Sequence, residues 1–386
     1  MPVPTSRLAA FYFAYFLALG AFSPYFSPHL ESRGLDAQQI SLLMGLWYGS
    51  RVFAPPLWHA WLRRRGHGGR WLVAGCALTL AGFSLFLLPL PSVGLALVML
   101  VFASFYNAVM PQFEAVTLEQ LGAQRHRYSR VRLWGSIGFL LANLGYGWLL
   151  QAVGYASLVL WMLPAYGLLL ACAVANRSAA AAVALRAPDA ARTESAAGPA
   201  PVLMLLWIAG LMQACHAPLY VYLSLFLAEH GWTPAMIGLA WALGVVAEVG
   251  MFAIMPQLLS RHDPRWLMAA CLAAGGVRWW LTAAHPGDVG VVLALQLLHA
   301  LTFAAFHASV MAMLSAGRSG AGLARAQAWL YGFASGGGGV VGALLAGWCW
   351  QQLGHAATFE AASLLSVLTL LLLPALPRHH AHAHPV

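Results

Sequence analysis

Long apolar stretches recur along the whole chain, from Leu8 to Leu376. Each is close to the length of about twenty residues that a helix needs to cross the hydrocarbon layer of a membrane. Helices are suited to this environment because they satisfy their backbone hydrogen bonds internally. The pattern therefore predicts an all-α polytopic membrane protein with twelve spans, at residues 7–28, 38–61, 70–90, 93–118, 131–152, 156–176, 202–229, 235–259, 265–284, 288–314, 324–351 and 356–376.

The charges predict how these spans are oriented. The chain is 61% hydrophobic and 8% charged, and its twenty basic residues are all arginines. They crowd the loops on one predicted side of the membrane, whereas the other side has only Arg33. Because basic loops stay in the cytoplasm, we expect both termini to be cytoplasmic. The net charge of +9 then reflects membrane insertion rather than nucleic-acid binding.

An alanine-rich segment divides the spans into two groups of six. It covers residues 177–200 and is predicted to be a cytoplasmic linker. It joins an N-terminal six-helix half, residues 1–176, to a C-terminal half, residues 201–377. A His-rich cytoplasmic tail follows at 378–386, and we expect it to be solvated rather than a metal site, because it supplies no fixed ligand geometry.

The two halves are related in sequence. A pairing of the second and eighth spans aligns Ile40 with Ile237 and Arg51 with Glu248. Duplicated six-helix halves, with a substrate site between them near the membrane midplane, are the plan of the major facilitator superfamily and favour a transporter that works by alternating access. Four further residues recur at an offset of 200, where Gly147, Trp148, Gln151 and Gly154 become Gly347, Trp348, Gln351 and Gly354.

Ionisable residues lie deep in several predicted spans. A charge at the centre of a membrane helix costs about 3 kcal/mol on insertion scales, so such groups indicate function. A water-filled cavity explains them together, whereas buried pairs that fix helix packing are the alternative for any single histidine. All but Arg278 fall on spans that line the cavity of such a transporter. The candidates are Arg51, Glu114, Arg132, His216, Glu248, Arg278, His299 and His307.

Aromatic residues provide further candidates for substrate binding. Tyr25, Tyr106 and Tyr222 lie on the first, fourth and seventh spans, where their rings could stack on a substrate ring, although core packing explains any one of them. The five cysteines show no paired spacing and predict buried thiols, without a disulfide or metal site. No catalytic motif or phosphate-binding loop is present, so we expect neither an enzyme nor a bound cofactor.

Four strings carry a resemblance to a known family. They are VRLWGSIGF (131–139), LGVVAEV (243–249), GGVRWW (275–280) and LLHALTFAAFH (297–307). These strings resemble the corresponding stretches of the phenylpropionate permease family, which are proton-linked carriers of the major facilitator superfamily. That family is related to the lactose permease and nucleoside permease groups. The likeness extends from about Leu8 to Pro377.

The wider resemblance to lactose permease implies roles for single residues. Glu114 and Arg132 match the acid and the arginine that hold its sugar. Glu248, Arg278 and His299 match its essential acid, arginine and histidine in the eighth, ninth and tenth helices.

Two positions depart from that pattern. Thr302 stands where lactose permease has the glutamate that releases the proton, and Gln296 replaces a nearby lysine. These departures argue against simple sugar transport. They leave Glu248, Glu114 or a histidine to carry a proton.

The expected function, as the resemblance implies, is proton-coupled uptake of a small aromatic carboxylic acid resembling phenylpropionate. We expect a carrier in the inner (plasma) membrane of a bacterium that works as a monomer. Arg51 or Arg132 would hold the carboxylate. Glu248 would carry the proton, because an ionised glutamate is costly during an occluded crossing. Arg278 would restore its charge balance. Other predicted substrate-binding residues are Glu114, Tyr25, Tyr106, His216 and Tyr222, and His299 and His307 are the other predicted proton-coupling residues.

Two other functions remain as alternatives. One keeps the fold but takes a sugar, an oligosaccharide or a nucleoside, with Glu114 and Arg132 binding its hydroxyl groups. The other is a nontransporting membrane sensor or a membrane enzyme, and the absence of a catalytic motif argues against the enzyme. The sensor is disfavoured because the sequence contains no soluble signalling domain.

Overall fold

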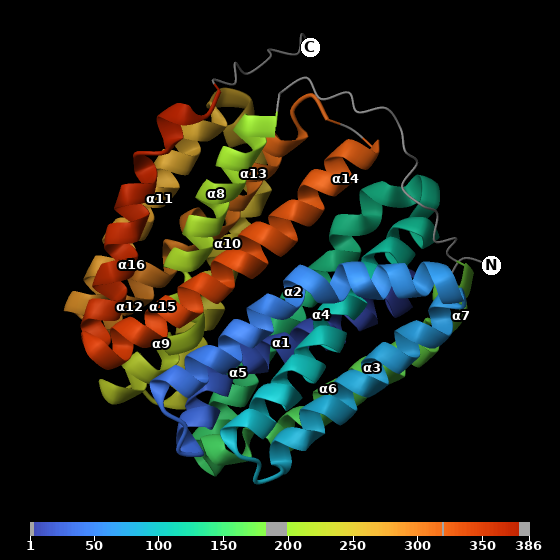
Figure 1. The fold of residues 1–386 in the computed structure, drawn as a ribbon, viewed down its shortest axis with the longest axis horizontal. Coiled ribbons are helices and arrows are strands. Elements are labelled where there is room, and N and C mark those ends of the chain that lie inside the picture. The colour runs from blue at the N-terminus through green and yellow to red at the C-terminus, as the bar shows by residue number, and fades with distance from the viewer. Residues whose placement is uncertain (1–3, 183–198, 319, 378–386) are drawn as a thin grey trace. The chain divides into compact units, whose positions relative to one another are not determined.

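The computed structural model describes residues 4–182, 199–318 and 320–377, and these are overwhelmingly helical (Figure 1). The predicted linker lies outside the described residues over 183–198, as does the tail over 378–386. The chain forms two compact units. Unit 1 comprises Met1–Ala187 with Thr233–Leu239, and unit 2 comprises Pro188–Trp232 with Ala240–Val386.

Unit 1 contains the first six predicted spans. In this unit α1 packs along α5, α2 packs against α4, and α3 packs against α4 and α6. A capping box at Asp36 starts α2. The Asp36 side chain accepts a hydrogen bond from the backbone N–H of Gln39, and the Gln39 side chain accepts one from the backbone N–H of Asp36. The helices are α1 Thr5–Ser32, α2 Ala37–Arg65, α3 Gly68–Ser84, α4 Ser92–Leu121, α5 Tyr128–Val153, α6 Leu158–Ala175 and α7 Arg177–Ala182, with the short turns η1 Leu85–Leu87, η2 Gly122–Arg127 and η3 Tyr155–Ser157.

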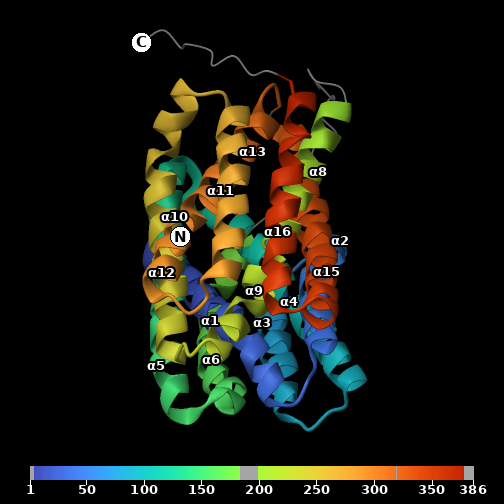
Figure 2. The same ribbon diagram turned by 90° about the vertical axis from the view of Figure 1, so that its left-hand side faces the viewer.

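Unit 2 contains the other six predicted spans. Here α11 packs along α16 and α13, and α8 packs against α15 and α16 (Figure 2). The first turns of α10 group with unit 1. The helices are α8 Pro199–Cys215, α9 Ala217–Glu229, α10 Pro234–Arg261, α11 Pro264–Ala284, α12 Val289–Leu297, α13 Phe306–Ser315, α14 Gly320–Trp329, α15 Gly338–Gln352 and α16 His355–Leu370, with the turns η4 Ala300–Ala305, η5 Leu330–Gly337 and η6 Leu373–Ala375.

Three of the predicted spans in unit 2 are broken rather than continuous. The seventh divides into α8 and α9 at His216. The tenth and eleventh each contain a π-helical stretch, η4 and η5. Wider π turns are rare and occur frequently at functional sites. In this protein η4 directly follows His299 and includes Thr302, so the irregular backbone coincides with predicted functional residues.

Each of the twelve predicted spans corresponds to a helix or a broken helix. Ten stretches of the described residues are long and apolar enough to cross a membrane, and one of them, Ser92–Val153, contains both α4 and α5. Helix α2 has 29 residues but is not among the ten, and its apolar sequence is interrupted by Arg51. Together with the comparisons below, this confirms the predicted all-α fold of twelve membrane helices.

The first six residues of the predicted linker are helical. Residues 177–182 form α7, which packs against the N-terminal end of α3. Gly68 and Gly69 permit this contact, because a Cβ atom on either would overlap the backbone of α7 at Ala180 or Arg177. Ordered helix therefore continues six residues beyond the predicted boundary.

The helical cores are apolar. An aromatic cluster in unit 1 includes Phe22 stacked on Trp47, with ring centroids 4.4 Å apart, and Phe83 next to Phe102. All five cysteines are buried, as the sequence predicts. Polar groups within these cores are therefore exceptions that need partners.

Candidate functional site

A fully buried arginine is the centre of a polar cluster in unit 2. Arg278 of α11 is 0% exposed. Its Nη1 donates to Thr302 Oγ1 at 3.0 Å and to His299 Nδ1 at 3.1 Å, and its Nη2 donates to Gln296 Oε1 at 2.9 Å. The guanidinium also lies 4.5 Å from the centre of the Trp279 ring. A buried cation is thus held by neutral hydrogen-bond acceptors and an aromatic face.

The contact with Arg278 fixes the tautomer of His299. A guanidinium can only donate, so Nδ1 of His299 must accept and carries no proton. The neutral ring then has its N–H at Nε2, and this atom lies 3.8 Å from Glu248 Oε2. His299 therefore presents its proton towards Glu248 and its lone pair towards Arg278. Glu248, His299, Arg278, Gln296 and Thr302 are called the Arg278 cluster below.

The two departures from the lactose permease pattern are both members of this cluster. Gln296 and Thr302 are 3% and 1% exposed, and both bind the Arg278 guanidinium. Sequence reasoning noted them as replacements but gave them no role. They flank His299 at a spacing of three residues, which places side chains on one face of a helix, and this spacing is the signal that could have grouped them.

The other predicted histidines of unit 2 lie around this cluster. His216, at the break between α8 and α9, bonds through Nδ1 to the Met212 carbonyl at 2.8 Å. Its ring centroid is 6.2 Å from that of His299 and 5.3 Å from that of Trp279. Phe303 stacks between His299 and His307, at 5.3 and 6.4 Å. The structure thus brings His216 next to the Arg278 cluster and puts a phenyl ring between His299 and His307.

Unit 1 contains a second polar cluster, more open than the first. Arg132 Nε of α5 lies 3.8 Å from Glu114 Oε1 of α4, and these side chains are 34% and 39% exposed. The Tyr128 hydroxyl donates to the same Glu114 oxygen at 3.3 Å. The Arg132 guanidinium lies 4.1 Å from the Phe16 ring centre and 5.4 Å from that of Tyr12. A cation beside aromatic faces suits a ligand that joins a carboxylate to an apolar ring.

Sequence reasoning did not select the aromatic members of this second cluster. Phe16 and Tyr12 come from α1, whereas Tyr128 begins α5. Tyr12 and Phe16 are four residues apart and therefore share a helix face, which is the only pattern that marks them. Glu114, Arg132, Tyr128, Phe16 and Tyr12 are called the Arg132 cluster below.

The remaining predicted residues lie among packed aromatic rings. The Arg51 guanidinium lies 4.9 Å from the ring centre of Tyr48, on its own helix α2. Tyr25, Tyr106 and Tyr222 are at most 1% exposed. The Tyr25 hydroxyl donates to the Asn143 carbonyl, Tyr106 donates to the Tyr15 carbonyl, and Tyr222 stacks on Trp350. These four residues do not join the Arg132 or Arg278 cluster through the contacts just given, and their role in binding stays a prediction.

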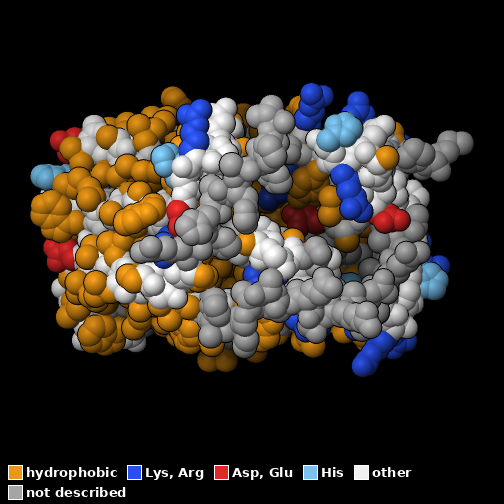
Figure 3. All heavy atoms as spheres, turned by 90° about the horizontal axis from the view of Figure 1, so that it is seen from above, with side chains coloured by type: hydrophobic (Ala, Val, Ile, Leu, Met, Phe, Trp, Pro, Cys, Tyr) orange, Lys and Arg blue, Asp and Glu red, His pale blue; other side chains and the backbone are white. Residues whose placement is uncertain are grey.

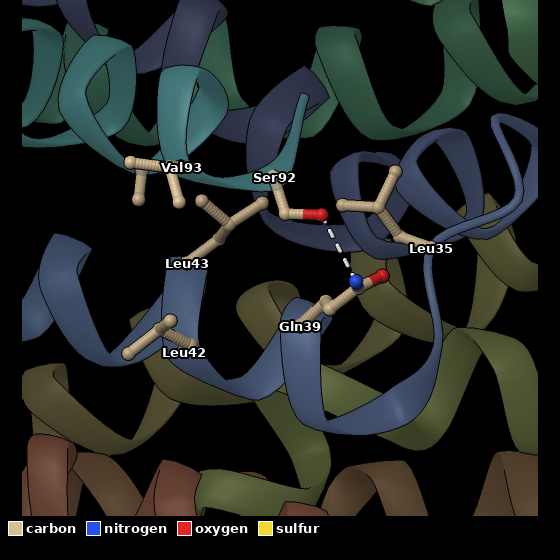
Figure 4. A pocket seen from close by; sticks show the side chains of 7 residues that line it. Leu35, Gln39, Leu42, Leu43, Ser92 and Val93 are labelled. Carbon is tan, nitrogen blue, oxygen red and sulfur yellow. Dashed lines mark hydrogen bonds between the residues drawn. The ribbon is translucent and has the colours of Figure 1, made fainter. Parts of the chain in front are cut away.

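A hollow of about 160 Å³ lies where α2 and α4 begin (Figure 4). Its lining is mostly leucine, valine and alanine. The polar side chains Gln39 and Ser92 bond to each other at 2.9 Å. This hollow therefore has little with which to fix an ion or a polar substrate, and it contains none of the predicted site residues.

Comparison with known proteins places the chain in a family. The MFS_1 like family matches residues 5–361. The chain belongs to this family. It is thus a multi-pass membrane protein of the transporter type, and the two clusters are polar sites within its membrane helices.

Curated relatives of this MFS_1-like protein include transporters with different printed substrates. It is 29% identical over 386 residues to the "Probable 3-phenylpropionic acid transporter" of Escherichia coli (strain K12), which covers 96% of this chain and 97% of that protein. It is 28% identical over 283 residues to the maltose permease of Geobacillus stearothermophilus, which covers 72% and 70%. The resemblance to the phenylpropionate permease family is confirmed at the level of sequence.

Solved structures share the fold at low sequence identity. The nucleoside transporter NupG matches with a TM-score of 0.79 and 15% identity, covering 96% of this MFS_1-like chain and 97% of its own. The POT family transporter PepTSo matches with a TM-score of 0.77 and 10% identity, covering 97% of each chain. These likenesses show a common fold and carry no information about the substrate.

Proposed function

We propose that this transporter couples the uptake of a small aromatic carboxylic acid to the entry of a proton. The observation that carries the proposal is the line of contacts from Glu248 through His299 to the buried Arg278. It joins an acid that can exchange a proton to a cation that cannot lose one. Intramembrane relays of acids and histidines are characteristic of pumps and transporters.

The Arg132 cluster supplies the proposed binding site. Arg132 offers a planar guanidinium that can hold a carboxylate through two parallel hydrogen bonds. Phe16 and Tyr12 supply ring faces next to it. Arg132 and Glu114 are both partly exposed, and the pair is long at 3.8 Å, so a substrate carboxylate can compete with Glu114 for the arginine. The similarity to a relative named for 3-phenylpropionic acid supports this substrate class.

The Arg278 cluster supplies the proposed coupling. An ionised Glu248 is costly to enclose in an apolar environment, whereas a protonated Glu248 is tolerated. The loaded carrier therefore crosses with Glu248 protonated rather than ionised, and the empty carrier returns after the proton has left, so that uptake of substrate is accompanied by entry of a proton. His299 faces Glu248 with its Nε2–H and stabilises the ionised form once the proton leaves. Arg278 holds His299 in that tautomer.

Uptake into proteoliposomes tests the substrate and the coupling together. With a pH gradient that is acidic outside, labelled 3-phenylpropionate is expected to accumulate above its external concentration. A protonophore is expected to abolish this accumulation, because the driving gradient is then lost. Liposomes without protein are the control. Equal accumulation with and without the gradient would contradict proton coupling.

A sugar is the second candidate substrate, and the similarity to a maltose permease favours it. In this case Glu114 and Arg132 would bind hydroxyl groups instead of a carboxylate. Competition separates the two candidates in the same proteoliposomes. We expect unlabelled 3-phenylpropionate to displace the label and maltose to have no effect. Uptake of labelled maltose that exceeds uptake of 3-phenylpropionate would reverse the assignment.

We further propose that both termini face the cytoplasm of a bacterium whose inner membrane holds the protein. Arginine side chains are prominent on the face shown in Figure 3. Arg33, the one arginine on the predicted outer side, donates to the Phe86 and Leu88 carbonyl oxygens and so caps the end of η1. It therefore has a local structural role that does not conflict with the orientation.

Cysteine labelling in intact cells tests this orientation. The native cysteines are buried, so single cysteines introduced at the exposed positions Ala123 and Gly287 are expected to dominate labelling. A membrane-impermeant maleimide should label position 287 from outside and position 123 only after the membrane is permeabilised. The reverse result would overturn the proposed orientation.

A further inference from the structure

The hairpin between α2 and α3 carries four arginines within eight residues, Arg63, Arg64, Arg65 and Arg70. All four are exposed, and residues 57–70 include no acidic residue. Within the described part of the chain, none of the four takes part in an ion pair. Four like charges held this close repel one another, so an anion that contacts several of them is stabilised.

An exposed apolar row leads along α2 to these charges. Phe53, Leu57, Trp61 and Arg65 are spaced four residues apart, so neighbours in the row lie side by side and the row winds slowly around the helix. The first three are 39%, 65% and 40% exposed, and the Arg65 guanidinium lies 4.7 Å from the Trp61 ring centre. The row spans about 18 Å at 1.5 Å per residue, close to one leaflet of a hydrocarbon core about 30 Å thick.

The hairpin is held in place by bonds to α4 and by ring packing. Trp58 Nε1 donates to Gln112 Oε1 at 2.8 Å, and Gln112 Nε2 donates to the Gly68 carbonyl at 2.8 Å. Trp61 meets Trp71 edge to face, with ring centroids 5.4 Å apart. A ligand on this surface therefore finds a preorganised backbone, which lowers the entropy lost on binding.

We propose that this hairpin binds an anionic phospholipid. The headgroup phosphate is held by Arg64 and Arg65 with their basic neighbours, through charge-assisted hydrogen bonds. One acyl chain lies along Phe53, Leu57 and Trp61. A free phosphate would not use the apolar row, and a phospholipid with no net charge would leave the arginine charges uncompensated. Orientation in the membrane requires basic residues near the helix ends, but it does not require their alignment with an exposed apolar row.

Lipid selectivity of the full-length protein tests the proposal. The protein is reconstituted in vesicles of phosphatidylcholine that contain a trace of spin-labelled phosphatidylglycerol or spin-labelled phosphatidylcholine. The fraction of motionally restricted label gives the preference for the anionic lipid. Wild-type protein is expected to prefer phosphatidylglycerol, and R64Q/R65Q to lower that preference at least about twofold, since each basic residue near the surface contributes to the attraction. High salt should lower it as well.

The chain offers a matched control in η2 and the start of α5. R125Q/R127Q also removes two exposed arginines, from a segment at 122–130 that contains no tryptophan. This variant is expected to keep the preference. Trp61→Ala, which keeps every charge, is expected to reduce the restricted fraction of both labels. An unchanged preference in R64Q/R65Q, or an equal loss in R125Q/R127Q, would overturn the proposed site. Helicity and monodispersity of each variant confirm that it is folded.

Discussion

Glu248→Gln is expected to abolish uphill uptake and to leave exchange of substrate across the membrane intact. The amide has nearly the shape of the protonated acid but cannot release a proton, so the carrier stays permanently in its neutral form. The loaded carrier then still crosses, whereas a pH gradient no longer has a group on which to act. Accumulation under an imposed gradient and counterflow into preloaded proteoliposomes measure these two activities separately.

Glu360→Gln is the matched control for this substitution. Glu360 is an exposed acid of α16, so its loss removes one carboxylate without touching the Arg278 cluster. Accumulation by the control is expected to equal that of the wild type. If Glu248→Gln still accumulates substrate against its gradient, the proton role given to Glu248 is wrong. If both accumulation and exchange fail in a folded protein, Glu248 is needed for the crossing itself rather than for coupling.

Arg132→Lys is expected to raise the KM for an aromatic carboxylate about tenfold or more. Lysine keeps the charge but loses the planar fork that holds a carboxylate through two parallel bonds. It also loses the flat surface that lies 4.1 Å from the Phe16 ring centre. Loss of one hydrogen bond to a charged group is worth about 1.5–3 kcal/mol, which corresponds to roughly 10- to 100-fold in affinity. Initial rates of uptake over a range of substrate concentrations give the KM.

Arg130→Lys provides the comparison on the same helix. Arg130 is exposed near the start of α5, two residues before Arg132, and the same exchange there should leave the KM unchanged. The prediction therefore requires that the KM rises in Arg132→Lys and stays unchanged in Arg130→Lys. A KM that is unchanged in Arg132→Lys would show that this arginine does not bind the carboxylate. Arg51 would then be the next candidate.

The helices could be predicted from the sequence because their signal is local. Apolar runs of membrane-spanning length mark all twelve, including α2 with its internal arginine. The interruptions at His216 and at η4 and η5 could not be predicted in the same way. At these interruptions the backbone N–H groups bond to different carbonyl oxygens than in a regular α-helix. This hydrogen-bond pattern depends on packing against neighbouring helices rather than on composition. Apolar residues continue through η4, so the pattern does not reveal it, whereas Pro218 at the start of α9 is a local mark of the break at His216.

Some contacts of the candidate sites could be predicted from the sequence, and others could not. Glu114 and Arg132 were paired through the resemblance, and the structure places them 3.8 Å apart across the turn between α4 and α5. The sequence predicts that Arg278 restores the charge balance of Glu248, and the structure shows Arg278 bound to His299, which itself faces Glu248. Residues that meet across separate helices leave no spacing in the sequence. Only residues on one helix left such a trace, namely the group around His299 with its period of three and the pair Tyr12 and Phe16 with its spacing of four.

The π-helical turn η4 has a mechanical consequence. A π turn contains more residues than an α turn, so its conversion to regular α-helix would rotate everything that follows by about 100° around the helix axis. Helix α13, Phe306–Ser315, follows η4 and starts next to His307. Thr302 lies within the turn and is fastened to Arg278. A change in the bonds of the Arg278 guanidinium that straightened this turn would therefore rotate α13 about its own axis.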